Sequence, residues 1–303
     1  MGRFKTFVLL ALVPWTPSAY SQPAAVPQWQ IDAGGKKAFD VASIKLATGD
    51  FRGPLFPLDN SDAFNPTGGR FFAQFTLLTF IQFAWKTRPT REQAQTILAP
   101  LPKWVATDRF EIEARAGGNP TKDQMRLMMQ SLLADRFHLA LHFETRETAV
   151  FGLTLVKPGN LGPKIRPHSE GPPCDKAVDP DVVFPERCDA QALMARPGRA
   201  LLAGSRNTTL DLIASSLAGL GGLGRPGVDQ TGLTGRYDFT LEWFDETGAF
   251  RPSPAAPAPG IAADAQGPSF LEALREQLGM KMESTRAPVQ FPVIDHIERL
   301  SEN

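Results

Sequence analysis

The chain has little cysteine and no excess of either charge. Only two cysteines occur among 303 residues, Lys+Arg and Asp+Glu both number 32, and the formal net charge is zero. A nucleic acid or an anionic membrane surface attracts proteins through a positive field, which a dense basic run or patch supplies. No such run occurs in the sequence. The charge balance therefore gives no support to either kind of partner.

Long hydrophobic runs are also missing, and the one apolar run near the N-terminus is short. Basic Arg3 and Lys5 precede apolar residues 7–13, and small residues at 19–21 offer a cleavage site before Gln22. This order is typical of a secretory signal peptide. The run is far shorter than the ~20 residues that span a bilayer. We therefore expect a signal peptide at residues 1–21 and a mature chain without a transmembrane segment, exported to the periplasm or the outside of the cell.

The two cysteines, Cys174 and Cys188, lie close together in a polar central segment. In an oxidising exported setting such a pair is expected to form one local disulfide. A zinc site is the weaker alternative, because zinc prefers four ligands and the only nearby histidine is His168. A redox pair is weaker still, because the C-x-x-C spacing is absent. We expect no metal and no cofactor.

Motifs that carry catalysis are missing or stand in the wrong context. Gly219, Gly221 and Gly224 satisfy G-x-G-x-x-G, but they follow a predicted helix, whereas a dinucleotide fingerprint opens one. No G-x-S-x-G nucleophile elbow occurs. Glu111 and Glu113 alternate with apolar residues on a predicted strand, so they are expected on its solvated face. The sequence therefore predicts no catalytic residue.

An internal repeat dominates what the sequence does contain. Residues 69–85 lead to a strand-like stretch at 108–116, and residues 198–218 lead to a similar stretch at 235–243. In each copy a capped amphipathic helix and a pair of apolar strands follow. The repeat predicts an α+β fold with two similar βαββαββ halves, whose helices pack on a mainly antiparallel sheet. The expected terminal strand pairs are 138–145 with 149–156, and 281–284 with 289–294.

Helix signals mark each half. Thr121 and Gln124 form a capping box, as do Ser269 and Glu272. The helix after Thr121 carries one apolar face, which is more typical of core than of a binding groove: Met125, Met128, Met129, Leu132 and Leu133. In the second half, the pattern predicts a strand at 200–204, a turn at Ser205, and a helix capped by Thr208.

Composition divides the chain further. Residues 158–197 are rich in Pro, Gly and charge and contain both cysteines, and residues 246–268 form a Pro/Ala/Gly insertion that we expect to be disordered or mobile. The expected units are a signal peptide (1–21), a first α+β half (22–157), a linker with the cystine (158–197) and a second α+β half (198–303).

Several segments resemble one bacterial family. They are FDVASIK, PKWVATDRFEIEA, MRLMMQSLLADRFHLALHFETRE, VDQTGLTGRYDFTLEW and LREQLGMKMESTRAPVQFPVIDHIERLSEN. They resemble a large exported, soil-associated family of unknown function, and this resemblance implies no reaction, ligand or catalytic residue. The stretch LDLIASSL…GVDQTGLTGRYDFTLEW is also similar to the short N-terminal modules of secretins and TonB-dependent receptors, which are helix-on-sheet interaction domains.

These observations favour a non-enzymatic exported protein that binds or docks in the cell envelope. The groove between the halves, or an exposed sheet edge, is the expected binding surface. One candidate is a turn between the halves, formed by Thr231, Gly232, Thr234, Gly235 and Arg236. The alternatives are a secreted hydrolase of envelope or environmental polymers, with its site between the halves, and a structural envelope component that self-associates.

Overall fold

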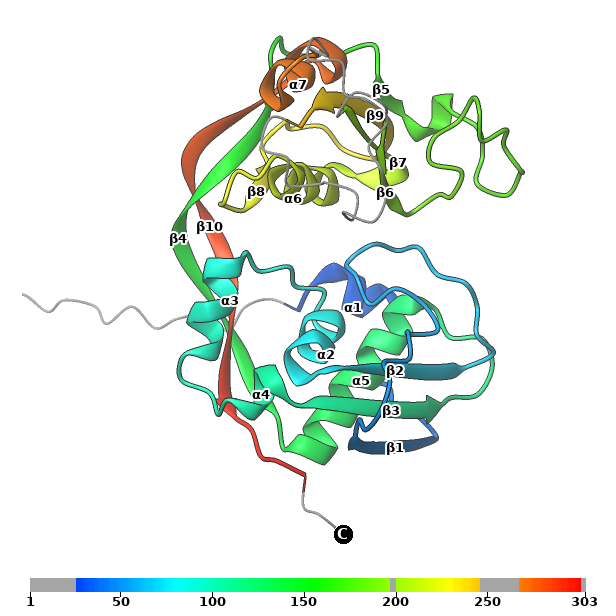
Figure 1. The fold of residues 1–303 in the computed structure, drawn as a ribbon, viewed down its shortest axis with the longest axis vertical. Helices are drawn as coiled ribbons and strands as arrows, with labels where there is room; N and C mark the ends of the chain where they lie inside the picture. The colour runs from blue at the N-terminus through cyan, green and yellow to red at the C-terminus, as the bar shows by residue number, and fades with distance from the viewer. Residues whose placement is uncertain (1–25, 197–199, 246–266, 301–303) are drawn as a thin grey trace, which may run out of the picture.

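Two lobes and a long two-stranded ribbon make up the protein in a computed structural model (Figure 1). The structure describes residues 26–196, 200–245 and 267–300, so the predicted signal peptide and nearly all of the predicted insertion lie outside it. The helices are α1 (Gln28–Asp32), α2 (Leu77–Ala84), α3 (Arg91–Leu98), α4 (Trp104–Thr107), α5 (Lys122–Phe137), α6 (Leu210–Leu220) and α7 (Phe270–Leu278). The strands are β1 (Val41–Leu46), β2 (Arg70–Thr76), β3 (Arg109–Arg115), β4 (Ala140–Leu155), β5 (Ile165–Pro167), β6 (Gln191–Ala195), β7 (Ala200–Thr209), β8 (Gly227–Asp229), β9 (Arg236–Phe244) and β10 (Met280–His296).

Three sheets organise these strands. The first lobe holds the antiparallel sheet β1-β3-β2, and the second holds the antiparallel sheet β5-β9-β7-β6. The third sheet, β10-β4-β8, joins the lobes, and in it only β8 is parallel to its neighbour. The predicted α+β class with mainly antiparallel sheets is confirmed. None of the helices in the described part of the chain is long and apolar enough to cross a membrane.

The two lobes repeat the same arrangement of elements. The strand order β1-β3-β2 of the first lobe corresponds to β5-β9-β7 of the second. A helix follows β2 and another follows β7, namely α2 and α6, and the capping-box helices α5 and α7 each lead into a long strand. Both of these helices end at a residue in the left-handed conformation, His138 and Gly279. The observed order of each repeat is ββαβαβ, with small additions.

The terminal strand pairs predicted for each half are wrong in one respect, because each pair is a single long strand. β4 and β10 pair with each other across both lobes, with Thr148 opposite Ala287 near the middle. The residues between the expected strands, 146–148 and 285–288, run through the centre of this ribbon. Residues 145–147 are exposed there. A strand segment that covers no core has no alternation of apolar and polar residues. The polar middle of each ribbon strand therefore has the sequence pattern of a turn.

Each lobe has its own hydrophobic core, and the ribbon contributes to both. The predicted apolar face of α5 is buried in the first core, where Met125, Met129 and Leu133 are fully inaccessible. The far end of β10 and the residues after it also pack on the first core through Ile294, Ile297 and Leu300. The second core receives its ribbon side chains from the other end of each strand: Leu153, Met280 and Met282. Each half therefore completes the core of the other.

The start of the second half differs from expectation. β7 continues to Thr209, so Ser205 is a fully buried strand residue and does not form a turn. A register shift between Ser205 and Thr208 lets the strand carry this polar stretch onward. The helix cap is Thr209, whose Oγ1 accepts a hydrogen bond from Leu212 N at 3.4 Å, whereas Thr208 donates to Arg206 O.

The Pro/Gly-rich segment 158–197 builds part of the second lobe. It supplies both edge strands of the four-stranded sheet, β5 and β6. Between them lie a short 3-10 helix, His168–Glu170, and the loop that contains both cysteines. This segment therefore places the cystine against the sheet of the second lobe.

Candidate functional site

A groove of about 730 Å³ lies between the two lobes. Its first wall is the loop at residues 54–65 of the first lobe, and its second wall is formed by residues 180–194 of the second lobe, including β6. Two exposed apolar side chains line it from opposite lobes, Leu55 at 42% and Met194 at 43% exposure. The groove thus has polypeptide on both sides and apolar side chains open to solvent.

β6 presents an unpaired edge beside this groove. It is the last strand in the order β5-β9-β7-β6, and within the described residues no strand pairs with its other side. Arg196 N donates to Ala200 O at 2.8 Å, and alternate residues of an antiparallel strand face its partner. The backbone N–H and C=O groups of Leu193 and Ala195 therefore face away from β7. Gln191 attaches β6 to helix α6, because its side chain donates a hydrogen bond to Leu212 O.

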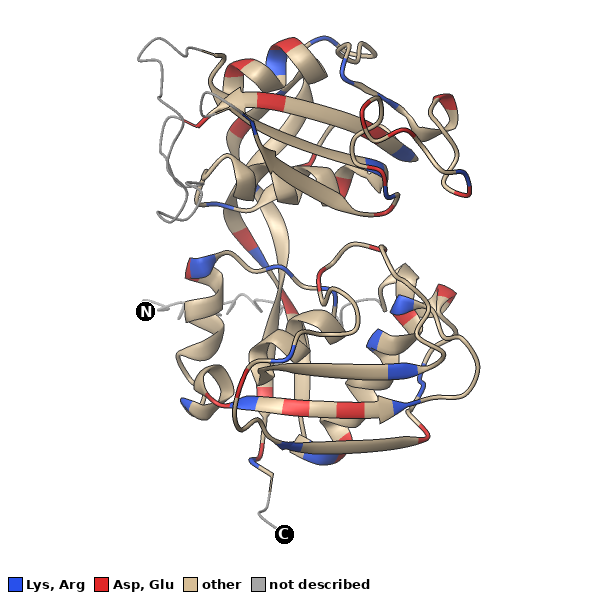
Figure 2. Ribbon diagram, turned by 45° about the vertical axis from the view of Figure 1, so that its right-hand side comes forward, with Lys and Arg blue, Asp and Glu red and all other residues tan. Residues whose placement is uncertain are grey.

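An ion-pair network connects the lobes next to the groove. Arg236, in the second lobe, lies 3.2 Å from Asp62 of the first lobe and 2.9 Å from Asp189. Asp62 also pairs with Lys86 at 2.7 Å. A backbone hydrogen bond from Ala63 N to Asp189 O joins the lobes at the same place. Charges of both signs are interspersed over the two lobes (Figure 2), which fits the balanced composition.

Two aspartates of this region, Asp59 and Asp62, have lowered pKa values. Burial acts to raise the pKa of Asp59, but hydrogen bonds from Lys122 and Ser61 outweigh it, and the pKa lies below its ordinary value. In Asp62, burial is likewise outweighed, here by the hydrogen bond and charge of Lys86 and by Arg236, and its pKa is also lowered. A general acid requires a raised pKa instead. These carboxylates are therefore suited to ion pairing.

The lowered pKa of Asp62 predicts an acid-sensitive contact between the lobes. A carboxylate whose pKa is lower in the folded state contributes stability above its unfolded pKa of ~3.9, and this contribution disappears as the pH falls through the folded-state pKa. Asp62→Asn should therefore lower the melting temperature at pH 7 more than at pH 3. Thermal unfolding at both pH values measures this. Asp135→Asn, at an exposed position, is the control, and an equal effect of the two variants at pH 7 would contradict the prediction.

The turn predicted as a binding site connects β8 to β9. Gly232 and Gly235 have φ values of +70° and +99°, which explains the two glycines. Thr231 closes the start of the turn through its N and Oγ1, which both donate to Asp229. Thr234 O accepts a hydrogen bond from the hydroxyl of Tyr237. Of the five residues, only Arg236 forms an ion pair with the described part of the first lobe, so the role of the whole turn in binding stays a prediction.

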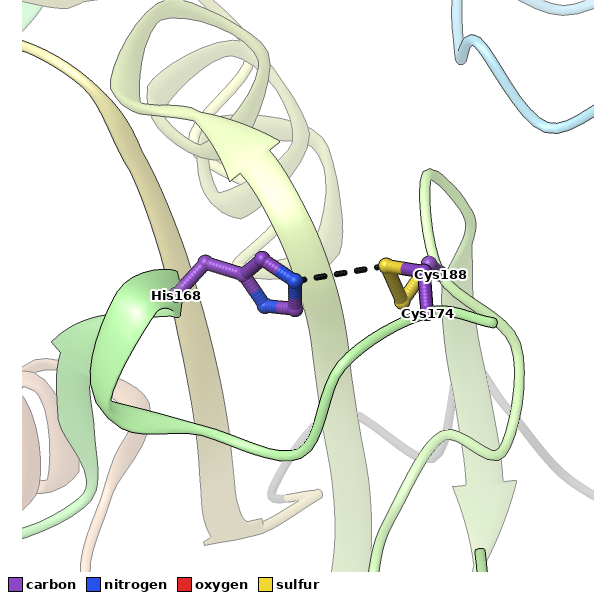
Figure 3. A group of neighbouring side chains, drawn as sticks. All are labelled: His168, Cys174 and Cys188. Carbon is purple, nitrogen blue, oxygen red and sulfur yellow. Dashed lines mark hydrogen bonds between the residues drawn. A yellow bond between two sulfur atoms is a disulfide. The ribbon is translucent and has the colours of Figure 1, made fainter. Parts of the chain in front are cut away.

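The predicted disulfide between Cys174 and Cys188 is confirmed, with a Cα–Cα distance of 5.7 Å. Beside it lies His168, whose Nε2 is 3.3 Å from Cys174 Sγ (Figure 3). The other ring nitrogen, Nδ1, lies 2.6 Å from Asp238 Oδ1. Because a carboxylate only accepts, Nδ1 carries the hydrogen of this bond and Nε2 faces the sulfur. The structure thus places an aspartate, a histidine and a cystine in line.

The surroundings of Asp238 are closely packed. Its side chain is 8% exposed, and Oδ1 also accepts a hydrogen bond from Asn207 N at 2.9 Å. Oδ2 is buried without a hydrogen-bond partner, and Arg166 Nε is 3.9 Å away. A Cβ at Gly171 would lie 2.2 Å from Oδ2, so only glycine allows the loop to approach this closely. The second lobe therefore holds the side chain of Asp238 in a fixed position.

One imidazole nitrogen and two sulfurs lie within 4.8 Å of one another here, at His168, Cys174 and Cys188. The two sulfurs are bonded to each other, so neither is a thiolate that could bind a metal. Sequence reasoning noted His168 only as the nearest histidine and did not select Asp238. Asp238 stands opposite the apolar face of its strand, and the loop that covers it comes from a segment with no periodic pattern.

Glu111 corrects a further expectation. It stands on the face of β3 that was expected to be solvated, yet it is 8% exposed. A hydrogen bond from Lys45, at 2.8 Å, and another from Gln74 lower its pKa. Its neighbour Glu113 is exposed as predicted. The side chains of Lys45 and Gln74, on the two neighbouring strands, cover Glu111. The sequence of β3 alone does not identify these partners.

Comparisons with known proteins identify a family, but the function of that family is unknown. Neither the functionally curated proteins nor the solved structures include a match. One protein family, described as "Protein of unknown function (DUF3738)", matches residues 78–297. This span runs from α2 in the first lobe to the end of the ribbon, and so includes the later part of the first repeat, the whole second repeat and the groove's second wall. Because the match covers well over half of the 303 residues, the chain belongs to this family of unknown function.

Proposed function

We propose that this chain is an exported, non-enzymatic docking protein of the cell envelope, and that its groove takes an extended segment of a partner protein. The segment adds to the unpaired edge of β6 and places apolar side chains against Leu55 and Met194. The observation that carries this proposal is the unpaired strand edge beside a groove lined from both lobes.

The chemistry of the groove supports an extended peptide in particular. Peptides that add a strand to a sheet edge gain main-chain hydrogen bonds, while pockets for alternate side chains supply specificity. The outward backbone groups of Leu193 and Ala195 offer such hydrogen bonds, and the exposed side chain of Met194 offers an adaptable apolar contact. A partner segment with alternating apolar side chains matches both features.

The alternative function, hydrolysis of a polymer at a site between the lobes, is less well supported. A hydrolase of glycosidic polymers needs one carboxyl group that stays protonated as a general acid. Beside the groove, Asp59 is paired with Lys122 and Asp62 with Lys86 and Arg236, and the pKa values of both carboxylates are lowered. The charge arrangement therefore favours docking.

A pull-down from envelope extract with two variants of one residue tests the proposal. Proline is tolerated in an edge strand where its missing N–H faces outward, so Leu193→Pro removes a docking donor and keeps the β6–β7 ladder. Leu193→Ala shortens the same side chain and keeps the N–H. We expect the wild type and Leu193→Ala to capture the same partner and Leu193→Pro to lose it.

Cross-linking through a photoreactive group at position 194 then identifies the partner's segment. Equal capture by both Leu193 variants would place docking elsewhere on the molecule, and no partner above background in any sample would contradict the docking function. Melting temperatures of the variants, measured in parallel, show whether a loss of capture is a loss of folding.

A further inference from the structure

We infer that Cys174–Cys188 is a thiol–disulfide exchange site, in which His168 stabilises the thiolate of Cys174 and Asp238 orients His168. The disulfide would then have a chemical role in addition to closing a loop. The inference stands on the geometry of the four side chains and on what holds the loop in place.

The geometry matches that of an activated cysteine. Such a cysteine lies within hydrogen-bond reach of a base, and a third group orients that base. His168 Nε2 is 3.3 Å from Cys174 Sγ, and Asp238 holds the opposite ring nitrogen at 2.6 Å. Cys174 is exposed, whereas Cys188 and His168 are half-buried. A reacting partner therefore reaches Cys174 first.

The loop stays in place without the disulfide. Arg206 is 2% exposed and donates to Glu186 O at 2.6 Å and to Pro172 O at 2.7 Å, so it contacts the chain near both cysteines. Asp189 N also donates to Arg206 O at 2.9 Å, next to Cys188. After reduction, these contacts keep both thiols beside His168. A reversible reaction at the cystine requires this property.

The exchange proceeds in two balanced steps. A thiolate of a partner attacks Cys174 Sγ, a mixed disulfide forms, and the S–S bond breaks so that its electron pair leaves with Cys188, which takes a proton. A second partner thiolate attacks the partner sulfur of the mixed disulfide, and Cys174 leaves as a thiolate beside the protonated imidazole of His168. Two partner thiols are oxidised to one disulfide, and the protein becomes a dithiol. The reverse sequence oxidises the dithiol with a partner disulfide.

The charges around His168 come from three strands. Asp238 on β9 contacts the ring directly, Arg166 on β5 lies 3.9 Å from Asp238 Oδ2, and Arg206 on β7 directs its guanidinium to loop carbonyls. Asp238 holds the ring so that Nε2 faces Cys174, and a protonated imidazole in that position stabilises a neighbouring thiolate. Exchange should therefore remain fast at pH values at which an ordinary thiol, with a pKa of ~8.5, is protonated.

The test uses the full chain with Cys188→Ser, which leaves Cys174 as its only thiol. Its reaction with an aromatic disulfide reagent, such as DTNB, is followed from pH 5.5 to 9, and absorbance at 240 nm follows thiolate formation. At pH 6, a larger fraction of Cys174 than of free cysteine should be thiolate, but a thiolate of lower pKa is a weaker nucleophile. We therefore expect Cys174 to react on the order of tenfold faster than free cysteine at this pH. Adding His168→Gln should abolish this advantage, and Asp238→Asn should shift the pH profile toward that of an ordinary thiol.

His142 provides a matched control, because it pairs with Asp295 at 2.9 Å on the ribbon and forms no contact with the cystine. His142→Gln in the Cys188→Ser background should leave the pH profile unchanged. An unchanged profile in His168→Gln, or a Cys174 that reacts like free cysteine, would overturn the inference. If Cys188→Ser does not fold, alkylation and peptide mapping of the reduced wild type, with and without His168→Gln, compare Cys174 with Cys188, and equal reactivity of the two thiols would contradict it.

Discussion

Separated into residues 22–157 and 158–303, the chain is expected to lose cooperative folding in both pieces. The cut lies just beyond the end of β4, in the connection between the two repeats. The sequence repeat alone would suggest two units, each of which folds independently. The ribbon predicts the opposite, because β4 and β10 pair along nearly their whole lengths and extend into both lobes.

The energetic reason lies in the two cores. The first piece lacks Ile294, Ile297 and Leu300, which pack on its core, and the second lacks Leu153 from its own. Burial of one large aliphatic side chain contributes ~1.5–3 kcal/mol when complete. Net stabilities of domains are only ~5–15 kcal/mol, so the loss of these side chains together with a whole strand partner is decisive. Each piece would also expose the long unpaired edge of its remaining ribbon strand, which favours aggregation.

Co-expression of the two pieces should restore folding, because the missing strand is then supplied in trans. Gel filtration should show a one-to-one complex, and thermal unfolding followed by circular dichroism should show one transition for the intact chain and for the complex. A cooperative transition of native-like amplitude in either isolated piece would show that the ribbon is not required. Each piece measured alone at the same concentration is the control.

Sequence patterns predicted the parts of the fold that face a core. The Met125–Leu133 face of α5 and the apolar face of β3 follow directly from the periodicity of apolar residues. The ribbon escaped prediction because its central residues cover no core, and without alternation a strand resembles a turn. Antiparallel pairing between the two halves, on which the lobe arrangement depends, is a long-range property that no local window contains.

The candidate sites were predictable to different degrees. The disulfide follows from two cysteines in a chain whose N-terminal sequence predicts export. Asp238 was not found, because an acidic residue opposite an apolar strand face is normally solvated. The groove depends on loop 54–65 lying against β6, and these segments are far apart in the sequence. Buried polar residues were the main class that pattern reasoning missed.

Arg126 is one of two buried arginines among these missed residues, and we expect its replacement by alanine to destabilise the protein strongly. The side chain is fully buried inside the first lobe. One end of the guanidinium donates to Asp123, and Nη2 donates to Asp59 O and Ser61 O at 2.8 and 2.9 Å. Its Cζ also lies 5.5 Å from the ring centre of Phe83. Arg126 therefore fastens the loop that forms the first wall of the groove to α5.

Arg126→Ala should destabilise the protein by about 3–5 kcal/mol, because removing one member of a buried charged network leaves its partners unpaired. For a protein of this size, this corresponds to a fall in melting temperature on the order of 10 °C. Burial lowers the pKa of Arg126 while the charge of Asp123 opposes the shift, which indicates that the ion pair compensates only part of the cost of burial. Much of the expected loss therefore comes from the cavity and from the unsatisfied carbonyl groups.

Arg136→Ala is the matched control, since Arg136 lies in the last turn of the same helix and is exposed. Its loss should cost only the ~0.3–1 kcal/mol of a helix-terminal charge. Similar melting temperatures for the two alanine variants would contradict the structural role of Arg126. If Arg126 positions the wall at residues 54–65, Arg126→Lys, which keeps the charge but not the forked geometry, should also weaken partner capture while the melting temperature falls less than in Arg126→Ala. Stability and docking would then both depend on the buried guanidinium of Arg126. Docking would depend on its hydrogen bonds to the carbonyl groups of Asp59 and Ser61, which hold the first wall of the groove.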